Sequence, residues 1–422
     1  MNRQTAASRQ WKWIGALVLA ALLLAPTVRA EPTSATAYLA SIQPSSDLQR
    51  FLDQTIDSLL ATDPLLRRVD LRVALLDLGG PDAPRLAHRD GEKPIYPASV
   101  VKFVYLMAAY AQQERGTVKI DAELDDLLTH MIRESSNQAT QHVVARLTDT
   151  QPGPELPPEG YAEFKRRRLT VDAWLRSLGV DDLHCVNPTY DGSADLSGRE
   201  VQFMKDRAAG GTLAARGDEF ANRNAMTADG TVKLLALLAT DRALSPADSE
   251  TVRRRMRRDP KEQPHLAARI AGGAARIPGL QVYSKSGTWG PIYADAGLVL
   301  APSGREFALA VFTQGDPPYR GDFIAELTSR AAVYLLNTLP ASQDATARGG
   351  RRARTRQRCD RERRPASTSG RRVACRAFAP APRTSASLAR TAERSSANLD
   401  RTTLFITEAQ SAQRRPAFAD MP

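Results

Sequence analysis

Ser99 and Lys102 stand three positions apart in the segment Tyr-Pro-Ala-Ser-Val-Val-Lys. Residues three apart share one face of a helix, so the Lys102 amine can reach back to the Ser99 hydroxyl. A serine hydroxyl becomes a good nucleophile when a base takes its proton. The apolar residues around Lys102 predict burial, which disfavours the ammonium form and makes the amine a candidate base. Alone, this spacing also fits an ordinary pair on a protein surface, because serine and lysine are common.

A second set of polar residues, Ser135-Ser136-Asn137, follows the amphipathic segment 125–134. A hydroxyl at Ser135 can relay a proton to a leaving group, and the Asn137 amide can hold both a substrate amide and a lysine. Taken singly, these residues also fit a helix cap or a turn.

The third set is Lys285-Ser286-Gly287-Thr288, directly after the strand-like segment 280–284. Gly287 lets a substrate backbone approach the strand edge closely. Lys285 and Ser286 can bind a carboxylate, and the backbone N–H of Thr288 can donate to an oxyanion. By itself this set is an ordinary strand end.

Together, the three sets resemble the S-x-x-K, S-D-N and K-T-G motifs of the class A β-lactamases and penicillin-binding proteins. The resemblance runs over roughly residues 45–339 and implies the β-lactamase/D-Ala-D-Ala-peptidase fold. It implies that the serine of the first motif is acylated, that its lysine activates it, and that no metal or cofactor is needed. The residues implied in this way are Ser99, Lys102 and Ser135 for catalysis, and Asn137, Lys285, Ser286, Gly287 and Thr288 for substrate binding.

The chain departs from the family pattern in several places. Ser136 replaces an aspartate and Ser286 a threonine, and both changes keep the hydroxyls and the amide. Only 36 positions separate Ser99 from Ser135, which is short for class A. We therefore expect a loop to be missing from one wall of the site, which leaves that side more open.

The largest departure lies after the helical segment 170–178. The family places a Glu-x-x-Leu-Asn there, whose glutamate activates the water that releases the acyl group, and the segment 184–192 has no such motif. Asp191, Asp195 and Glu200 are the carboxylates nearby, and each fits a solvated loop charge. The resemblance therefore predicts acylation without fixing the residue that completes the cycle.

The apolar periodicity predicts the elements that must position these residues. Strands at both ends of the domain, around a block of helices, indicate an α+β fold: an antiparallel sheet flanked by helices with an inserted helical subdomain. Residues 150–160 and those from about 179 to 223 read as irregular. The predicted helices are 46–61, 98–115, 121–147, 170–178, 226–239, 246–256 and 323–339, and the predicted strands are 69–78, 85–89, 280–287, 294–301 and 306–312.

The formal net charge of +11 resides in the last 82 residues. Residues 341–422 hold 18 arginines, no lysine and 7 acidic residues, so the rest of the chain is neutral. This distribution argues against a nucleic-acid partner for the domain at 46–340. The tail has scattered apolar residues, which predicts disorder. Two interpretations of the tail remain. Its arginines could bind anionic polymers of the cell envelope, or the tail could be a wrong-frame sequence.

The N-terminus has the pattern of a signal peptide over residues 1–30. Positive residues precede an apolar run at 14–25 that is too short to span a bilayer comfortably, and Val-Arg-Ala ends at Ala30. We expect cleavage after Ala30, a short leader over 31–45, and a periplasmic or secreted protein without a stable membrane anchor. Cys185 stands alone in the domain and predicts a buried free thiol.

The resemblance favours a monomeric serine hydrolase that opens a β-lactam or related amide through an acyl-Ser99 intermediate. Deacylation is expected to be slow because the glutamate motif is missing. A D-Ala-D-Ala peptidase or another cell-wall peptide hydrolase is the first alternative, because the same residues serve both reactions. A non-catalytic binding module is the second. The expected partner is in each case a small β-lactam or a cell-wall peptide.

Overall fold

The computed structural model describes residues 34–79, 83–191, 196–213 and 220–336. The predicted signal peptide, the Arg-rich tail and Asp195 lie outside these ranges. The chain divides into two compact units, Met1–Leu339 and Pro340–Pro422, and every described residue belongs to the first.

A six-stranded sheet organises the first unit, in the order β1-β3-β2-β8-β7-β6. Neighbouring strands are antiparallel, except that the two-residue β1 pairs parallel with β3. The central pairing joins β2 to β8 and matches Asp70 with Gln314 and Asp77 with Phe307. The strands are β1 (Gln43–Pro44), β2 (Asp70–Asp77), β3 (Arg85–Arg89), β6 (Gln281–Trp289), β7 (Ile292–Leu300) and β8 (Glu306–Gln314).

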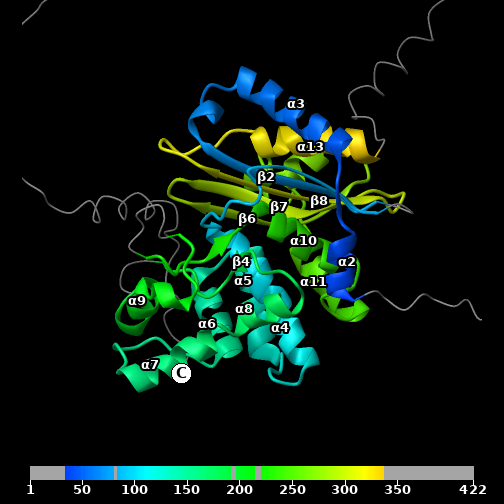
Figure 1. Ribbon diagram of the computed structural model, residues 1–422. Coiled ribbons are helices and arrows are strands. Elements are labelled where there is room, and N and C mark those ends of the chain that lie inside the picture. Colours follow the sequence, from blue (N-terminus) through cyan, green and yellow to red (C-terminus); the bar gives the residue numbers. More distant parts are fainter. Residues whose placement is uncertain (1–33, 80–82, 192–195, 214–219, 337–422) are drawn as a thin grey trace, which may run out of the picture. The chain divides into compact units, whose positions relative to one another are not determined.

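Each face of the sheet packs against its own helical layer, because alternate side chains of a strand point to opposite faces. Val73 and Leu75 pack with α3 (Ser46–Thr62), α12 (Ile270–Ala274) and α13 (Phe323–Leu336). Ala74 and Leu76 pack with the other helical layer. Figure 1 shows α3 and α13 over one face of the sheet, and α10, α11 and α4 on the other side.

The second helical layer surrounds one buried helix, α4 (Lys102–Glu114). Every residue from Lys102 to Gln112 is buried, as expected for a helix that is apolar around its circumference. The neighbouring helices are α5 (Ala122–Arg133), α6 (Asn137–Thr148), α7 (Pro158–Arg168), α8 (Thr170–Ser177), α9 (Gly198–Lys205), α10 (Ala228–Ala239) and α11 (Pro246–Met256). The inserted helical block therefore places Lys102 at the start of the central helix.

These observations confirm the predicted α+β class and most elements. The predicted helix over 121–147 is wrong: it breaks at 134–136 into α5 and α6, because Ser135 takes a left-handed φ of 59°. Helix α9 lies in a stretch that was predicted to be irregular, and α7 begins at the end of another and continues over 161–168, for which no element was predicted. Residues 34–45 of the predicted leader form α2 (Ala35–Ser41) and β1, and Tyr38 joins the core.

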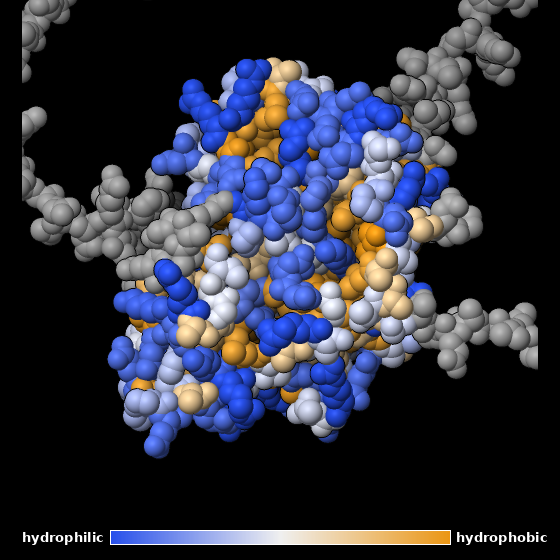
Figure 2. Space-filling model, in the orientation of Figure 1, coloured by the Kyte–Doolittle hydropathy of each residue, from blue (hydrophilic) through white to orange (hydrophobic). Residues whose placement is uncertain are grey.

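Two surface properties bear on the predictions. None of the helices within the described ranges is long and apolar enough to cross a membrane. The face shown in Figure 2 is mostly hydrophilic, with apolar residues gathered in small patches between polar ones. Cys185 is buried and free, as predicted.

Candidate active site

Ser99 lies on a single 3₁₀ turn, Ala98–Val101, that leads into α4. In a 3₁₀ turn residues i and i+3 are eclipsed, and the Lys102 N–H donates to the Ser99 carbonyl. Ala98 has a φ of 48°, a left-handed conformation that costs free energy for a residue with a Cβ. The turn buries Val100 and Val101 and leaves Ser99 half-buried. Local strain thus shapes the turn that presents this serine.

Lys102 is fully buried, and its Nζ atom contacts the second motif. It donates to the Ser135 carbonyl at 2.5 Å and to Asn137 Oδ1 at 2.7 Å, and it lies 3.4 Å from Ser135 Oγ. Within the described ranges the Lys102 hydrogen bonds go to these residues rather than to the Ser99 hydroxyl. Burial lowers the pKa of Lys102 to about 7, and the negative charge of Asp191 opposes this shift. An amine with that pKa is half neutral near pH 7 and can accept a proton.

Ser135 occupies the break between α5 and α6, and its hydroxyl also meets the third motif. Lys285 Nζ donates to Ser135 Oγ at 2.9 Å. Lys285 is 1% exposed, and both burial and the positive charge of Lys102 lower its pKa. Two lysine side chains therefore converge on one serine hydroxyl.

Gly287 brings strand β6 against the turn that carries Ser99. A Cβ at this position would lie 2.7 Å from the Pro97 carbonyl oxygen and 3.0 Å from the Val100 nitrogen. Only glycine permits so close an approach of two backbones. We predicted that Gly287 lets a substrate backbone approach the strand closely. In the structure, the backbone that approaches Gly287 is that of the turn carrying Ser99.

Ser286 and Thr288 lie on either side of Gly287. The Ser286 carbonyl accepts a 2.8 Å hydrogen bond from Lys285 Nζ. The Thr288 hydroxyl accepts a 2.6 Å hydrogen bond from Arg269. The predicted roles of the Ser286 hydroxyl and of the Thr288 N–H stay predictions.

Sequence reasoning gave no role to two buried arginines behind β6. Arg258 donates to the carbonyls of Ile132 and Ser284, at 2.6 and 3.1 Å. Arg269 lies over the Tyr293 ring, 3.4 Å from its centroid. The one signal for Arg258 was its place in an arginine-rich run, where nothing distinguishes it from the others. With the two lysines, these arginines surround the site with positive charge.

The segment 183–191 reaches the site through a network of amide side chains. It starts at β4 (Leu183–His184), which pairs with β5 (Ala225–Met226). Asn224 Oδ1 accepts from the N–H groups of residues 186 and 187, both at 2.8 Å. At the far end, Asn137 Nδ2 donates to the Tyr190 carbonyl at 3.2 Å. Asn137, whose amide oxygen contacts Lys102, therefore also holds Tyr190, the residue directly before Asp191.

Glu200 is not the solvated loop charge that the sequence suggested. It is 2% exposed, forms an ion pair with Arg168, and accepts a 2.7 Å hydrogen bond from the Tyr190 hydroxyl. A carboxylate held in this way is a structural anchor for the segment. Asp191 is exposed, and its charge acts on Lys102.

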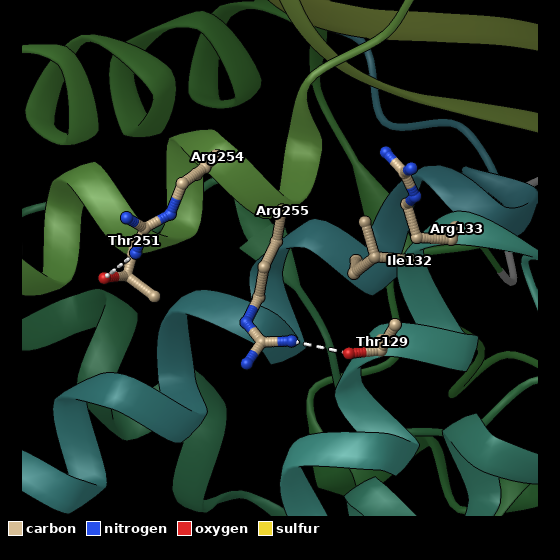
Figure 3. A pocket seen from close by; sticks show the side chains of 6 residues that line it. All are labelled: Thr129, Ile132, Arg133, Thr251, Arg254 and Arg255. Carbon is tan, nitrogen blue, oxygen red and sulfur yellow. Dashed lines mark hydrogen bonds between the residues drawn. The ribbon is translucent and has the colours of Figure 1, made fainter. Parts of the chain in front are cut away.

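A separate open pocket of about 330 Å³ lies between α5 and α11. Figure 3 shows Arg255 directed at Thr129, to which it donates at 2.7 Å, and Arg254 directed at Thr251. Arg255 also forms an ion pair with Asp125. None of the predicted catalytic residues lines this pocket.

The fold and the convergence of three motifs define the class of protein. A serine–lysine pair, a second serine and a strand lysine come together between a mainly antiparallel sheet and a helical block, as in the β-lactamase/D-Ala-D-Ala-peptidase fold. The chain belongs to the beta-lactamase enzyme family, whose model matches residues 118–335. The matched segment includes Ser135 and Lys285, whereas Ser99 and Lys102 precede it.

Solved structures of related proteins resemble the chain at low sequence identity. A β-lactamase from Sphaerobacter thermophilus DSM 20745 is 18% identical with a TM-score of 0.49, over 68% of this chain and 98% of that one. PBP-A is 17% identical with a TM-score of 0.47, over 70% and 98%. A class A β-lactamase from Bacteroides cellulosilyticus DSM 14838 is 19% identical with a TM-score of 0.46, over 68% and 98%. No curated protein matches the chain in sequence.

Proposed function

We propose that this protein is a serine hydrolase that opens a β-lactam or a related amide through an acyl-Ser99 intermediate. The observation that carries the proposal is the buried Lys102 amine, which has a pKa of about 7 and lies beside Ser135 and Asn137. A neutral amine can take a proton from a nearby hydroxyl. Ser99 lies on the 3₁₀ turn that directly precedes Lys102.

The proposed reaction starts when Ser99 Oγ attacks the amide carbonyl and its proton passes to Lys102. The oxyanion that forms accepts hydrogen bonds from the N–H groups of Ser99 and Thr288. Cleavage of the C–N bond requires a proton on the leaving nitrogen, which Ser135 delivers from the lysine pair. Water then attacks the ester carbonyl and releases Ser99 as a free hydroxyl.

The charges around the site support an anionic substrate. Lys285 and the buried Arg258 and Arg269 place positive charge behind β6, and Asp295 is the buried carboxylate among them. A substrate carboxylate would offset this charge, which fits the proposed role of Lys285 with Ser286. Penicillins and peptides with a free C-terminus both carry such a carboxylate.

The second half of the cycle is proposed to be slow. Glu200, a buried carboxylate on α9 that follows the segment 184–192 where the family's glutamate motif is missing, is held by Arg168 and Tyr190. One of its oxygens accepts a hydrogen bond from Arg168 and the other from Tyr190, so the carboxylate is already engaged within the protein. Long-lived acyl-enzymes are also a property of penicillin-binding peptidases, so this observation favours a cell-wall peptidase as the second candidate.

Mass spectrometry of the intact protein after a penicillin pulse tests the proposal. We expect a covalent adduct of one penicillin that decays slowly, and we expect Ser99→Ala to abolish it. Unchanged labelling of Ser99→Ala would refute the nucleophile. Fast multiple turnover of nitrocefin would refute slow deacylation, and product analysis on muropeptides separates the lactamase from the peptidase. The predicted signal peptide supports the further proposal that the protein acts in the periplasm or outside the cell.

A further inference from the structure

The open pocket of about 330 Å³ between α5 and α11 has a lining rich in arginine. Among the described residues that line it, none has a carboxylate. They are Thr129, Ile132, Arg133, Thr251, Arg254 and Arg255. Figure 3 shows Arg133 with its guanidinium group on a different side of the pocket from that of Arg254. The pocket therefore presents positive charge at more than one point.

Neutral hydroxyl groups hold two of the arginines in place. Arg254 donates to Thr251 Oγ1 at 3.0 Å, and Arg255 donates to Thr129 Oγ1 at 2.7 Å. Each hydroxyl uses its own hydrogen on a helix carbonyl one turn earlier, both at 3.0 Å, so its oxygen is free to accept from the arginine. These bonds orient the guanidinium groups without cancelling their charge.

Carboxylates neutralise only part of this charge. Arg255 forms an ion pair with Asp125. Arg254 is exposed, and its side-chain hydrogen bond goes to the hydroxyl named above. Arg133 is exposed too, and in the described part of the chain its side chain has no hydrogen bond or ion pair. Two full positive charges, on Arg133 and Arg254, are thus left at the pocket.

The nearest acidic residues in the sequence are engaged elsewhere. Glu134 on the α5 side pairs with His130 at 2.9 Å, and Glu250 on α11 pairs with Arg253 at 3.2 Å. The last turns of the two helices contribute the partial negative charge of their carbonyl groups, about half an elementary charge at each end. That is less than the two charges present, so a net positive charge remains.

This charge reaches the interior of the protein through Arg258. Its side chain donates to the carbonyl of Ile132, in the pocket lining, at 2.6 Å. Burial lowers the pKa of Arg258 to about 10, the charge of Asp295 opposes this shift, and the positive charge of Arg133 adds to it. An anion bound at Arg133 would remove this repulsion.

We infer that the pocket between α5 and α11 binds a ligand with a chain of two or more phosphate groups. A guanidinium fork fits the oxygens of carboxylates and phosphates alike. At an exposed arginine a single carboxylate contributes little, whereas a phosphate brings up to two charges and three acceptor oxygens. A chain of such groups meets arginines that lie on different sides of the pocket. The site is independent of the proposed function, because none of the proposed catalytic residues lines it.

Modification of arginines by phenylglyoxal, followed by peptide mapping of the full-length protein, tests the pocket residue by residue. The mapping separates it from the arginines of residues 341–422. At constant ionic strength, we expect tripolyphosphate to protect Arg133 and Arg254 at about a tenfold lower concentration than inorganic phosphate. Arg68 is the internal control and should stay unprotected, because it is exposed, lies outside the pocket, and likewise has no ion pair in the described ranges.

A variant tests whether the arginines act on one ligand. Arg133→Gln should raise the tripolyphosphate concentration that protects Arg254 at least about tenfold, whereas Arg68→Gln should leave it unchanged. Vesicles that display a lipid diphosphate, compared with tripolyphosphate in solution, separate a lipid-borne ligand from a free one, and protection by either supports the pocket.

Three results would overturn the inference. Equal protection of Arg68, Arg133 and Arg254 would show general screening by the anion. Protection of Arg254 that does not change in Arg133→Gln would show that the two arginines bind anions separately. Protection by phosphatidylglycerol vesicles, without any by tripolyphosphate or the lipid diphosphate, would assign the arginines to an anionic membrane surface instead.

Discussion

Lys285 and Ser135 are 150 positions apart in the chain and meet at 2.9 Å between Nζ and Oγ. Lys102 Nζ lies 3.4 Å from the same oxygen. Burial lowers the pKa of both amines, and the positive charge of Lys102 lowers the pKa of Lys285 further. This arrangement makes a neutral amine available near neutral pH.

The acylation rate is therefore expected to depend on pH through Lys102. Its neutral form is the base, so the rate of acylation by benzylpenicillin should rise as the pH rises through about 7. Lys102→Ala should lower the rate by about 10²- to 10⁴-fold and remove this limb. Stopped-flow acylation from pH 5 to 9 measures the profile. A wild-type rate that stays flat across this range contradicts the role of Lys102.

Asp191 should affect the pH at which the acylation rate reaches half of its maximum. Its negative charge raises the pKa of Lys102, so Asp191→Asn should move the midpoint of the profile to lower pH. Glu134→Gln is the matched control, because Glu134 is exposed and forms its ion pair with His130. A midpoint that stays in place or rises in Asp191→Asn would count against this coupling. The decay rate of the adduct in the same variant shows whether Asp191 also activates water.

Gly287→Ala should damage the site through its backbone. The added methyl group would lie 2.7 Å from the Pro97 carbonyl oxygen, so β6 and the Ser99 turn must separate. We expect acylation to fall at least about tenfold and stability to fall by about 1–3 kcal/mol. Gly160→Ala is the control, because its new Cβ would meet nothing closer than 3.6 Å. Equal acylation by both variants would show that the close approach does not matter.

His184 should make stability depend on pH. Burial opposes its charge, but hydrogen bonds to Asp172 and Asn222 and the Asp172 charge outweigh burial and raise its pKa. A raised pKa stabilises the fold at low pH, and this contribution disappears as the pH rises through the folded-state pKa. The free energy that His184→Gln removes should therefore shrink with rising pH. Urea unfolding from pH 5 to 9 measures it, with the exposed His142→Gln as control, and a difference that grows with pH refutes it.

The buried pair of Arg168 and Glu200 should be costly to break. Arg168→Met leaves the carboxylate without its charge partner and should lower stability by about 3–5 kcal/mol. Tyr190→Phe removes one 2.7 Å hydrogen bond to Glu200 and should cost about 1 kcal/mol. Denaturant unfolding compares the two variants. Similar small losses in both would show that the ion pair contributes little.

Much of the site could be predicted because its motifs are short and local. Ser99 and Lys102 are neighbours along the chain, and the 3₁₀ turn places them at its start and directly after its end. Lys285 lies in strand β6, whose first part was predicted from its apolar pattern. The predicted contact of Asn137 with a lysine is confirmed, whereas its contact with the Tyr190 carbonyl was not predicted and its contact with a substrate stays a prediction.

The remaining features depend on contacts between distant residues. The prediction of one helix over 121–147 joined two helices, although Ser135-Ser136-Asn137 also fitted a helix cap, because the left-handed backbone of Ser135 is not encoded in the apolar periodicity. Glu200 looked solvated because Arg168 is 32 positions away, in a segment for which no element was predicted. The contact of Tyr96 with Trp289 joins two segments that share no motif.

The pairing of β2 with β8 has a consequence for when the protein gains activity. Asp70 of β2 pairs with Gln314 of β8. The middle of the sheet can therefore form only after β8, the last strand in the sequence, has been synthesised. Until β8 joins β2 to β7, the sheet does not hold β6 beside the turn of Ser99. Ser99 and Lys285 then belong to two parts of the chain that have not yet assembled. Long-range closure of this kind is slow. We therefore expect an incomplete chain to form no acyl adduct, and we expect acylation by penicillin to return during refolding with the same time constant as the completed sheet.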